Sequence, residues 1–328
     1  MNHFLKIFLI ILGVIIAAVG ITLTVLQVSY PKAGEAPVIK VDSSPAQIER
    51  GKYLANHVAV CVDCHSQRDW NSFAGPLIPG TEGRGGEEFN EKYGFPGTFF
   101  SKNITPAGIG SWTDGEIYRA ITSGVSRNGE PFFPVMPYIN YNSMDTEDAH
   151  AIIAYLRTLK PIENKVPESR PNFPVNFILR TMPKPAQPQK RPGASDVLAY
   201  GKYLTNLAAC DGCHTPQEKG KAIEGMYMAG GFEFPLFTGG VVRSANLTSD
   251  KETGIGNWSK ASFISRFKTY ADSSMQHIPA EKGKFNTFMP WIMYSGMSEE
   301  DLGAIYTYLQ SVPAIKNEVE KFSPKVGK

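Results

Sequence analysis

The chain has 328 residues, a formal net charge of +2, 42% hydrophobic residues and 20% charged residues. This length suits about two ordinary domains, and the composition is that of a globular protein. A net charge this small gives no support for a nucleic-acid partner, because attraction to phosphates needs a surplus of basic residues. We therefore expect a folded protein that does not bind nucleic acid.

The first element is an uncharged apolar run over residues 7–28, IFLIILGVIIAAVGITLTVLQV. A run of this length can cross a bilayer as one helix, whereas a cleaved signal peptide has a shorter apolar part followed by small residues. Because the end of the run, QVSYP, is a poor cleavage site, we predict an uncleaved membrane anchor over residues 1–30. A cleaved signal peptide is the alternative.

The rest of the chain contains one sequence plan twice. GKYL precedes CVDCH in the first copy and CDGCH in the second. NIT or NLT follows, then GIGSW or GIGNW, then a Met-Pro pair, and finally an apolar segment with helical spacing. These repeats predict two tandem, mostly α-helical domains over residues 46–160 and 196–315, with long loops rich in glycine and proline.

Glycines inside the repeats and prolines between them predict how the chain is arranged. Gly51 and Gly201 lie inside the first helix of each copy, where glycine lowers helix stability. We expect each glycine to permit a close crossing with the closing helix of its own copy. Residues 161–195, between the copies, are rich in proline, which favours an extended linker.

Each copy contains one Cys-x-x-Cys-His motif, and the two motifs hold all four cysteines of the chain. In a helical turn, residues i, i+3 and i+4 lie on one side. Two thiols can then form thioethers with the vinyl groups of a haem while the imidazole lies beneath the iron, and this spacing is typical of c-type haem attachment. We predict two covalently bound haem c groups. The attachment residues are Cys61, Cys64 and His65, and Cys210, Cys213 and His214.

Two other uses of the cysteines are a redox dithiol and a zinc site. A redox dithiol usually lies in a βαβ unit, which the sequence lacks. A four-cysteine zinc site would bridge two domains and leave both histidines without a role. Since haem is attached outside the bacterial cytoplasm, we expect both domains to face the periplasm at the inner (cytoplasmic) membrane.

The repeats also suggest the second axial ligand of each iron. Methionine gives a high potential that suits electron transfer. Met136 and Met289 occupy equivalent positions, each before a proline. The stretch before Met289 is longer than its counterpart and contains His277, which is an alternative ligand. Further candidates are Met293 and Met297.

Haem propionates need hydrogen-bond donors when they are buried. Trp112 and Trp258 offer indole N–H groups, and Asn103 and Asn246 offer amide N–H groups. We predict propionate contacts for these four residues, and an ordinary place in the core is the alternative for the tryptophans.

The order of these motifs resembles that of the bacterial class I cytochrome c domain, and the first copy, with NIT, GIGSW and MPY, is the closer match. The chain is similar to the cytochrome c subunits of membrane-bound quinohaemoprotein alcohol dehydrogenases. This resemblance implies ligation by His65 with Met136 and by His214 with Met289. Those subunits usually carry three haem domains whereas this chain has two, and the second copy has MPW in place of MPY.

The function that we predict is electron transfer rather than catalysis. Electrons would arrive from a dehydrogenase or a quinol-oxidising complex and leave toward an oxidase or a soluble cytochrome. The alternative is a dihaem redox enzyme, either a peroxidase or a thiosulfate dehydrogenase. Thiosulfate dehydrogenases use a cysteine ligand at the active haem, and this chain has no fifth cysteine.

Overall fold

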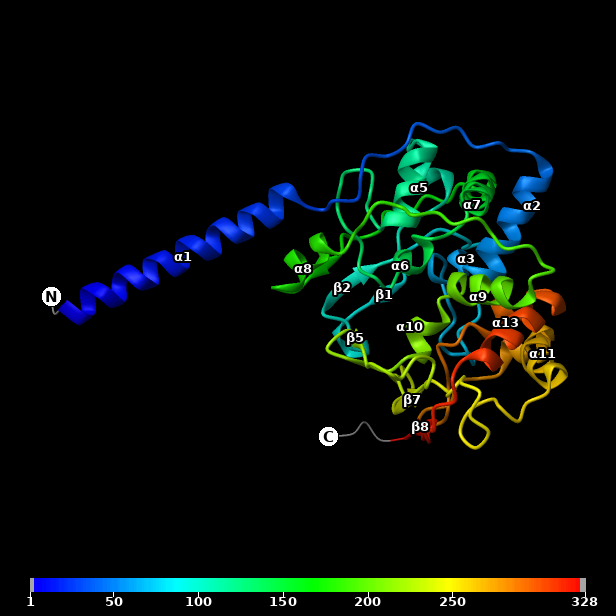
Figure 1. The fold of residues 1–328 in the computed structure, drawn as a ribbon. Coiled ribbons are helices and arrows are strands. Elements are labelled where there is room, and N and C mark those ends of the chain that lie inside the picture. Colours follow the sequence, from blue (N-terminus) through cyan, green and yellow to red (C-terminus); the bar gives the residue numbers. More distant parts are fainter. Residues whose placement is uncertain (1–2, 325–328) are drawn as a thin grey trace.

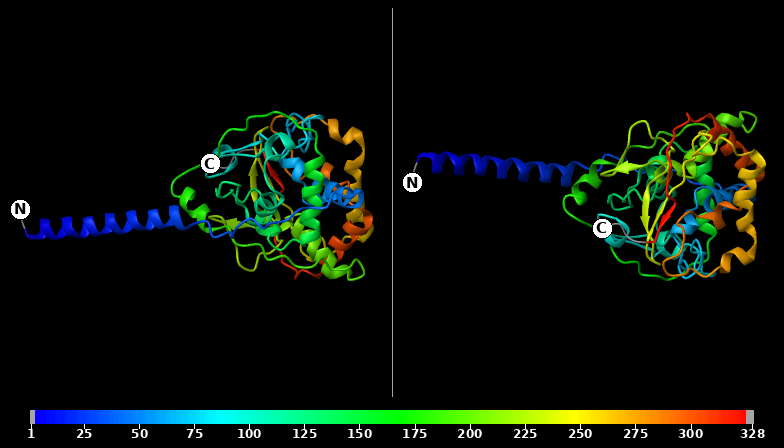
Figure 2. Two further views of the ribbon diagram at one scale, coloured as in Figure 1. Left: turned by 90° about the horizontal axis from the view of Figure 1, so that it is seen from above. Right: turned by 90° about the horizontal axis from the view of Figure 1, so that it is seen from below.

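The computed structural model describes residues 3–324 as a long N-terminal helix followed by a helix-rich body (Figure 1). Helix α1 (His3–Ser29) has no buried residue and extends away from the body in every view (Figure 2). With a mean hydropathy of 2.9, it is the one helix within residues 3–324 that is long and apolar enough to cross a membrane. A membrane anchor and a signal sequence both fit this description.

The first half of the body is built on two helices that cross closely. Helix α2 (Pro45–Tyr53) packs against α7 (Thr146–Thr158). A Cβ atom added to Gly51 on α2 would lie 1.8 Å from the carbonyl oxygen of Ala151 on α7. The two backbones therefore touch at a place that no side chain can occupy, which confirms the role expected for this glycine.

The second half repeats this crossing with α9 (Val197–Leu207) and α13 (Glu299–Ser311). A Cβ atom added to Gly201 would lie 2.0 Å from the carbonyl oxygen of Ala304. The equivalent glycine therefore has the same role in both copies, and the body is helix-rich as predicted.

Shorter elements complete each half. The first half contains η1 (Leu54–Val58), α3 (Cys61–Cys64), η2 (Glu91–Tyr93), α4 (Pro106–Ile109), α5 (Asp114–Ser123) and α6 (Tyr138–Tyr141). The second half contains α10 (Cys210–His214), α11 (Lys260–Lys268), η3 (Thr269–Ala271), η4 (Ser273–His277) and α12 (Trp291–Tyr294).

The strands are short and form three small antiparallel sheets with the orders β1-β2-β3, β4-β5 and β6-β7-β8. They are β1 (Glu88–Phe89), β2 (Gly97–Phe100), β3 (Arg170–Pro171), β4 (Gln217–Glu218), β5 (Lys221–Ala222), β6 (Glu233–Pro235), β7 (Val241–Arg243) and β8 (Phe322–Ser323). In the first sheet Glu88 lies opposite Phe100, and Gly97 lies opposite Pro171. In each three-stranded sheet one edge strand, β3 or β8, comes from a distant part of the chain, so these two sheets join segments far apart in the sequence.

The two copies differ by one residue between GKYL and the first cysteine. In the first half the extra residue lies in the π-helical turn η1, where the N–H of Ala59 donates to the oxygen of Leu54 at 2.8 Å. In the second half the N–H of Ala208 donates to the oxygen of Leu204 in a regular α-turn. A π-turn holds one residue more than an α-turn, so both motifs begin at equivalent places.

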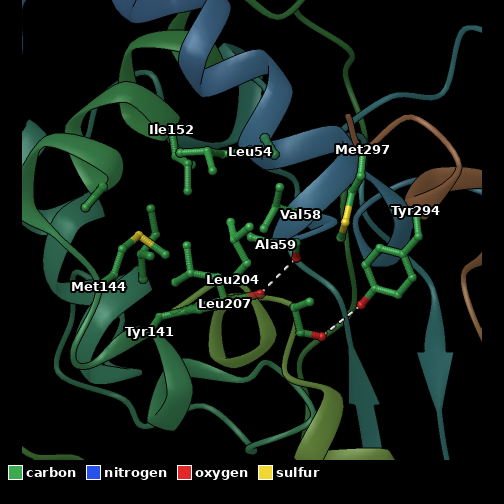
Figure 3. Packing of buried hydrophobic residues seen from close by; sticks show 14 of the residues in the cluster. Leu54, Val58, Ala59, Tyr141, Met144, Ile152, Leu204, Leu207, Tyr294 and Met297 are labelled. Carbon is green, nitrogen blue, oxygen red and sulfur yellow. Dashed lines mark hydrogen bonds between the residues drawn. The ribbon is translucent and has the colours of Figure 1, made fainter. Parts of the chain in front are cut away.

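One hydrophobic cluster lies at the centre of the body and is shared by both halves (Figure 3). Two independent domains would each bury a core of their own, whereas here the closing and opening helices of the two copies pack into a common interior. The fully buried members include Leu54, Met144, Ile152 and Ile153 from the first half, and Leu204, Leu207, Met297 and Leu302 from the second.

The proline-rich segment between the copies runs along the surface of the first half. It contains β3, which pairs with β2, and the short helix α8 (Val175–Thr181), which lies beside α1. The N–H groups of Gln187 and Gln189 donate to the carbonyl oxygens of Asn142 and Ser143. The segment is thus bonded to the body along much of its length.

Candidate haem-binding sites

Both Cys-x-x-Cys-His motifs form short helical turns. Helix α3 contains both cysteines of the first motif and is followed by His65, and α10 contains the whole second motif. The residue before each motif is left-handed, with φ of 44° at Val60 and 49° at Ala209. This conformation ends the preceding helix and turns the chain into the motif, so the thiols and the imidazole of each motif lie on one turn.

A backbone carbonyl orients each motif histidine. The Nδ1 atom of His65 lies 2.6 Å from the oxygen of Lys102, and that of His214 lies 2.8 Å from the oxygen of Ala245. A carbonyl only accepts, so Nδ1 carries the proton and Nε2 is left with a lone pair that can bind a metal. Both rings are partly buried, and this burial lowers the pKa of each imidazole. The neutral, metal-binding form is therefore favoured.

Glycines hold the chain close to these histidines. The N–H of Gly85 donates to the oxygen of His65 at 2.8 Å, and a Cβ atom at this residue would lie 2.5 Å from the carbonyl carbon of Lys102. Gly230 makes the same contacts in the second half. Since both glycines have positive φ, of 70° and 72°, a larger residue would be strained and would displace the carbonyl that fixes the imidazole.

The methionines predicted as second ligands have equivalent backbone settings. The N–H of Tyr138 donates to the oxygen of Met136 at 2.7 Å, and the N–H of Trp291 donates to that of Met289 at 2.7 Å. Helices α6 and α12 begin directly afterwards, and both methionines pack partly buried against the core. Two thiols, a neutral imidazole and a thioether form the donor set expected of a covalently attached haem with His/Met ligation. The residues of both halves fit this group.

The additional residues before the second methionine pair with the first half of the body. The N–H of Phe73 donates to the oxygen of Ile278, and the N–H of Ala280 donates to the oxygen of Asn71, both at 2.7 Å. His277 lies on this segment and is exposed. The longer stretch therefore fastens the two halves together, which gives the insertion a structural role independent of iron ligation.

The zinc alternative requires side chains that converge on one point. Within residues 3–324, no three His, Cys, Asp or Glu side chains are grouped so that they could hold a metal ion. The two pairs of cysteines thus remain on separate turns, as attachment of one group to each motif requires.

The two asparagines predicted to contact propionates organise their own loops. The Oδ1 atom of Asn103 accepts from the N–H and the hydroxyl of Thr105, at 3.0 and 2.7 Å, and its Nδ2 donates to the oxygen of Ile162 at 2.8 Å. Asn246 repeats these bonds in the second half. Trp112 packs partly buried against the core, while Trp258 is 39% exposed. Propionate contacts by these four residues stay a prediction.

A pair of tyrosines at the sites was not predicted from the sequence. Tyr141 donates its hydroxyl to the oxygen of Ala59, and Tyr294 donates its hydroxyl to that of Ala208, each at 2.8 Å (Figure 3). Each bond joins the helix after the methionine to the chain just before the motif of the same half. Both tyrosines stand five residues after the methionine, and this shared spacing was the available signal.

Each half also contacts the motif region of the other. Asn140, on α6, donates its Nδ2 to Asp211 inside the second motif at 2.8 Å. The Nδ1 atom of His57, on η1, lies 2.9 Å from the carbonyl oxygen of Met293 on α12. His57 is partly buried in this interface. The helix that follows each methionine thus packs against the helical segment that leads into the motif of the other half.

Comparison with known proteins agrees with this geometry. Residues 198–313 match the family described as Cytochrome c. This match lies in the second half, although the motifs made the first copy appear closer. The second half therefore contains a cytochrome c domain.

The chain is also similar over most of its length to curated bacterial proteins. It is 30% identical over 300 residues to the cytochrome c subunit of an alcohol dehydrogenase (quinone) from Gluconacetobacter polyoxogenes, covering 86% of this chain and 59% of that protein. It is 31% identical over 292 residues to a gluconate 2-dehydrogenase cytochrome c subunit from Pantoea cypripedii, covering 83% and 61%. A protein named diheme cytochrome c-type from Cereibacter sphaeroides is 27% identical over 267 residues, covering 78% and 83%. The predicted resemblance to dehydrogenase cytochrome c subunits is confirmed, and the chain spans about three fifths of the length of the first two relatives.

Proposed function

We propose that this chain, which contains a cytochrome c domain, is a membrane-anchored dihaem electron-transfer subunit of a bacterial dehydrogenase system. The observation that carries the proposal is the repetition of one complete donor set. Each half has a Cys-x-x-Cys-His turn, an imidazole oriented through Nδ1 by a backbone carbonyl, and a methionine in the equivalent backbone setting.

The proposed haem c groups are held by residues of both repeats. When bound, each group supplies an iron that takes up and releases one electron. The chain holds the axial ligands in place, and methionine ligation favours a high potential. The proposed ligands are His65 with Met136 and His214 with Met289, the thioether positions are Cys61, Cys64, Cys210 and Cys213, and the propionate contacts are Asn103, Trp112, Asn246 and Trp258.

The arrangement of the halves supports transfer between the two sites. Asn140 of the first half bonds to Asp211 of the second motif, and His57 of the first half bonds to Met293 of the second. Because the helix that follows each methionine packs against the helical segment that leads into the motif of the other half, two bound haems would share one protein interior. An electron can then pass between them without leaving the body.

Helix α1 and the relatives support proposals for the cellular location and the redox partners of the chain. We propose that α1 anchors the protein in the inner membrane and that residues 46–160 and 196–315 are two cytochrome c domains facing the periplasm. The relatives are named as subunits of dehydrogenases, so the proposed electron donor is a dehydrogenase or a quinol-oxidising complex. The proposed acceptor is an oxidase or a soluble cytochrome.

A dihaem enzyme would need at least one iron open to its substrate. The equivalent settings of Met136 and Met289 favour two closed, six-coordinate sites instead. Electron transfer is therefore preferred over peroxidase or thiosulfate chemistry.

The test is a haem count on the purified full-length protein. A pyridine haemochrome assay, normalised to protein mass, should give two c-type haems per chain. The double variant Cys61→Ala/Cys64→Ala and the double variant Cys210→Ala/Cys213→Ala should each retain one. A wild-type count of one, or a count that one of these variants leaves unchanged, would contradict the dihaem assignment.

A further inference from the structure

Helix α8 lies beside the end of α1 that joins the body (Figures 1 and 2). Arg180 on α8 donates from Nη2 to the carbonyl oxygen of Gln27 and from Nε to that of Tyr30, both at 3.2 Å. These carbonyls belong to the last turn of α1 and to the residue directly after it. The short helix of the proline-rich segment is thus bonded to the membrane-spanning candidate at the point where that helix would leave the bilayer.

The α8 region buries one apolar side chain and exposes two others. Leu179 is 3% exposed, whereas Ile178 is 51% exposed and Phe173, just before the helix, is 74% exposed. The ring of Phe173 lies edge-on to that of Phe177, with the centroids 6.2 Å apart. Large apolar side chains gathered at one place on a surface indicate contact with another apolar phase.

The same region carries residue types that favour a lipid headgroup layer. Tyr30 follows α1 directly, and the ammonium group of Lys32 lies 5.0 Å from the centre of its ring. Lys184 is exposed three residues after α8. Tyrosine is enriched where membrane helices meet water, and basic side chains near the surface are attracted to anionic headgroups. The chemistry around α8 therefore matches a bilayer surface rather than a second soluble protein.

We propose that α8 rests at the surface of the membrane, with Phe173 and Ile178 inserted among the lipid headgroups and the adjoining acyl chains. This inference rests on the proposed membrane anchor, because α1 brings α8 to the bilayer. The body then touches the membrane at two places, through α1 and through α8. A second contact restricts rotation of the body about α1 and determines which face is turned toward partners in the same membrane.

The experiment places a nitroxide label at single added cysteines in the full-length, haem-loaded protein reconstituted in vesicles of phosphatidylethanolamine and phosphatidylglycerol. The test positions are Phe173→Cys and Ile178→Cys. The control is Ser265→Cys. Ser265 is exposed, and its helix α11 lies on the side of the body opposite α1 (Figure 1). Labels at 173 and 178 should be more accessible to oxygen than to a water-soluble nickel chelate, and the label at 265 should show the reverse.

A label at Ile15→Cys, in the middle of α1, separates this inference from the anchor on which it rests. If the label at 15 reports lipid while those at 173 and 178 are as accessible to the nickel chelate as that at 265, the anchor stands and the α8 contact is refuted. If the label at 15 also reports water, or if N-terminal sequencing finds α1 removed, both are refuted.

Discussion

Replacing Gly51 with alanine should force α2 and α7 apart. The added Cβ atom would lie 1.8 Å from the carbonyl oxygen of Ala151, whereas carbon and oxygen atoms approach to about 3.3 Å at closest. The helices must therefore separate by about 1.5 Å, and the obstacle is backbone, which cannot rotate away. Overpacking a well-packed core costs about 1–3 kcal/mol, and we expect the upper end here. Alanine regains up to about 1 kcal/mol of helix propensity, so the net loss should be about 2 kcal/mol.

The matched control is Gly303→Ala on α13, where the new Cβ atom meets only the flexible end of the Lys260 side chain. Lysine can move aside, so this variant should be neutral or up to about 1 kcal/mol more stable. Thermal unfolding of the haem-loaded protein, followed by circular dichroism, should place Gly51→Ala about 4–8 °C below wild type at about 2–4 °C per kcal/mol. Equal midpoints for the two variants would refute the account of the helix crossing.

Three further predictions concern the sites and their supports. Met136→Leu and Met289→Leu should each retain both covalent haems, while one iron becomes five-coordinate and its reduction potential falls. Raman spin-state markers report the coordination number, and a redox titration measures the potential. An unchanged spectrum would show that the substituted methionine serves only in packing. Tyr141→Phe leaves a buried carbonyl without its donor and should lower the free energy of unfolding by about 1–3 kcal/mol in a denaturant titration; no change would show that the bond is dispensable. Burial raises the pKa of Asp114, but the N–H of Val41 and the guanidinium of Arg157 outweigh it and lower that pKa overall. The folded pKa then lies below the unfolded value of about 3.9, so the stabilisation by ionised Asp114 is present above about pH 4 and is lost as the pH falls through the folded pKa. Thermal unfolding midpoints measured from pH 6 to pH 2 should therefore fall less steeply for Asp114→Asn than for wild type. Parallel plots of midpoint against pH for the two proteins would contradict this.

Local features of this fold could be predicted from the sequence because their causes are local. The turn that brings Cys61, Cys64 and His65 together follows from spacing along a helix. The crossing at Gly51 followed from a glycine in a place where glycine is otherwise unfavourable. The repeat gave independent support for each prediction, since Gly201 stands at the same place in the second copy as Gly51 does in the first. Residue type and spacing were sufficient in these cases.

Features that depend on distant parts of the chain could not be predicted in this way. The insertion around His277 looked like a ligand-bearing stretch, but its neighbours bond to Phe73 and Asn71 in the other half. The one-residue difference before the motifs gave no sign that a π-turn would absorb it at Ala59. Residues that bond in this way lie far apart in the sequence and meet only in the folded protein, so no pattern within a short stretch of sequence identifies them.

The shared interior explains why the two copies form one body. The tyrosine of each GKYL sequence reaches the start of the closing helix in the other copy. Tyr53 donates to Asp301 at 2.6 Å, and Tyr203 donates to Asp148 at 2.7 Å. Both carboxylates are buried, and a buried charge that loses its donors is strongly destabilising. Removing either copy would therefore take a hydroxyl donor away from a buried carboxylate of the other, while Arg50 and Arg191 would still pair with Asp148. These contacts between the tyrosine of each GKYL sequence and the closing helix of the other copy thus hold the two halves together in one body.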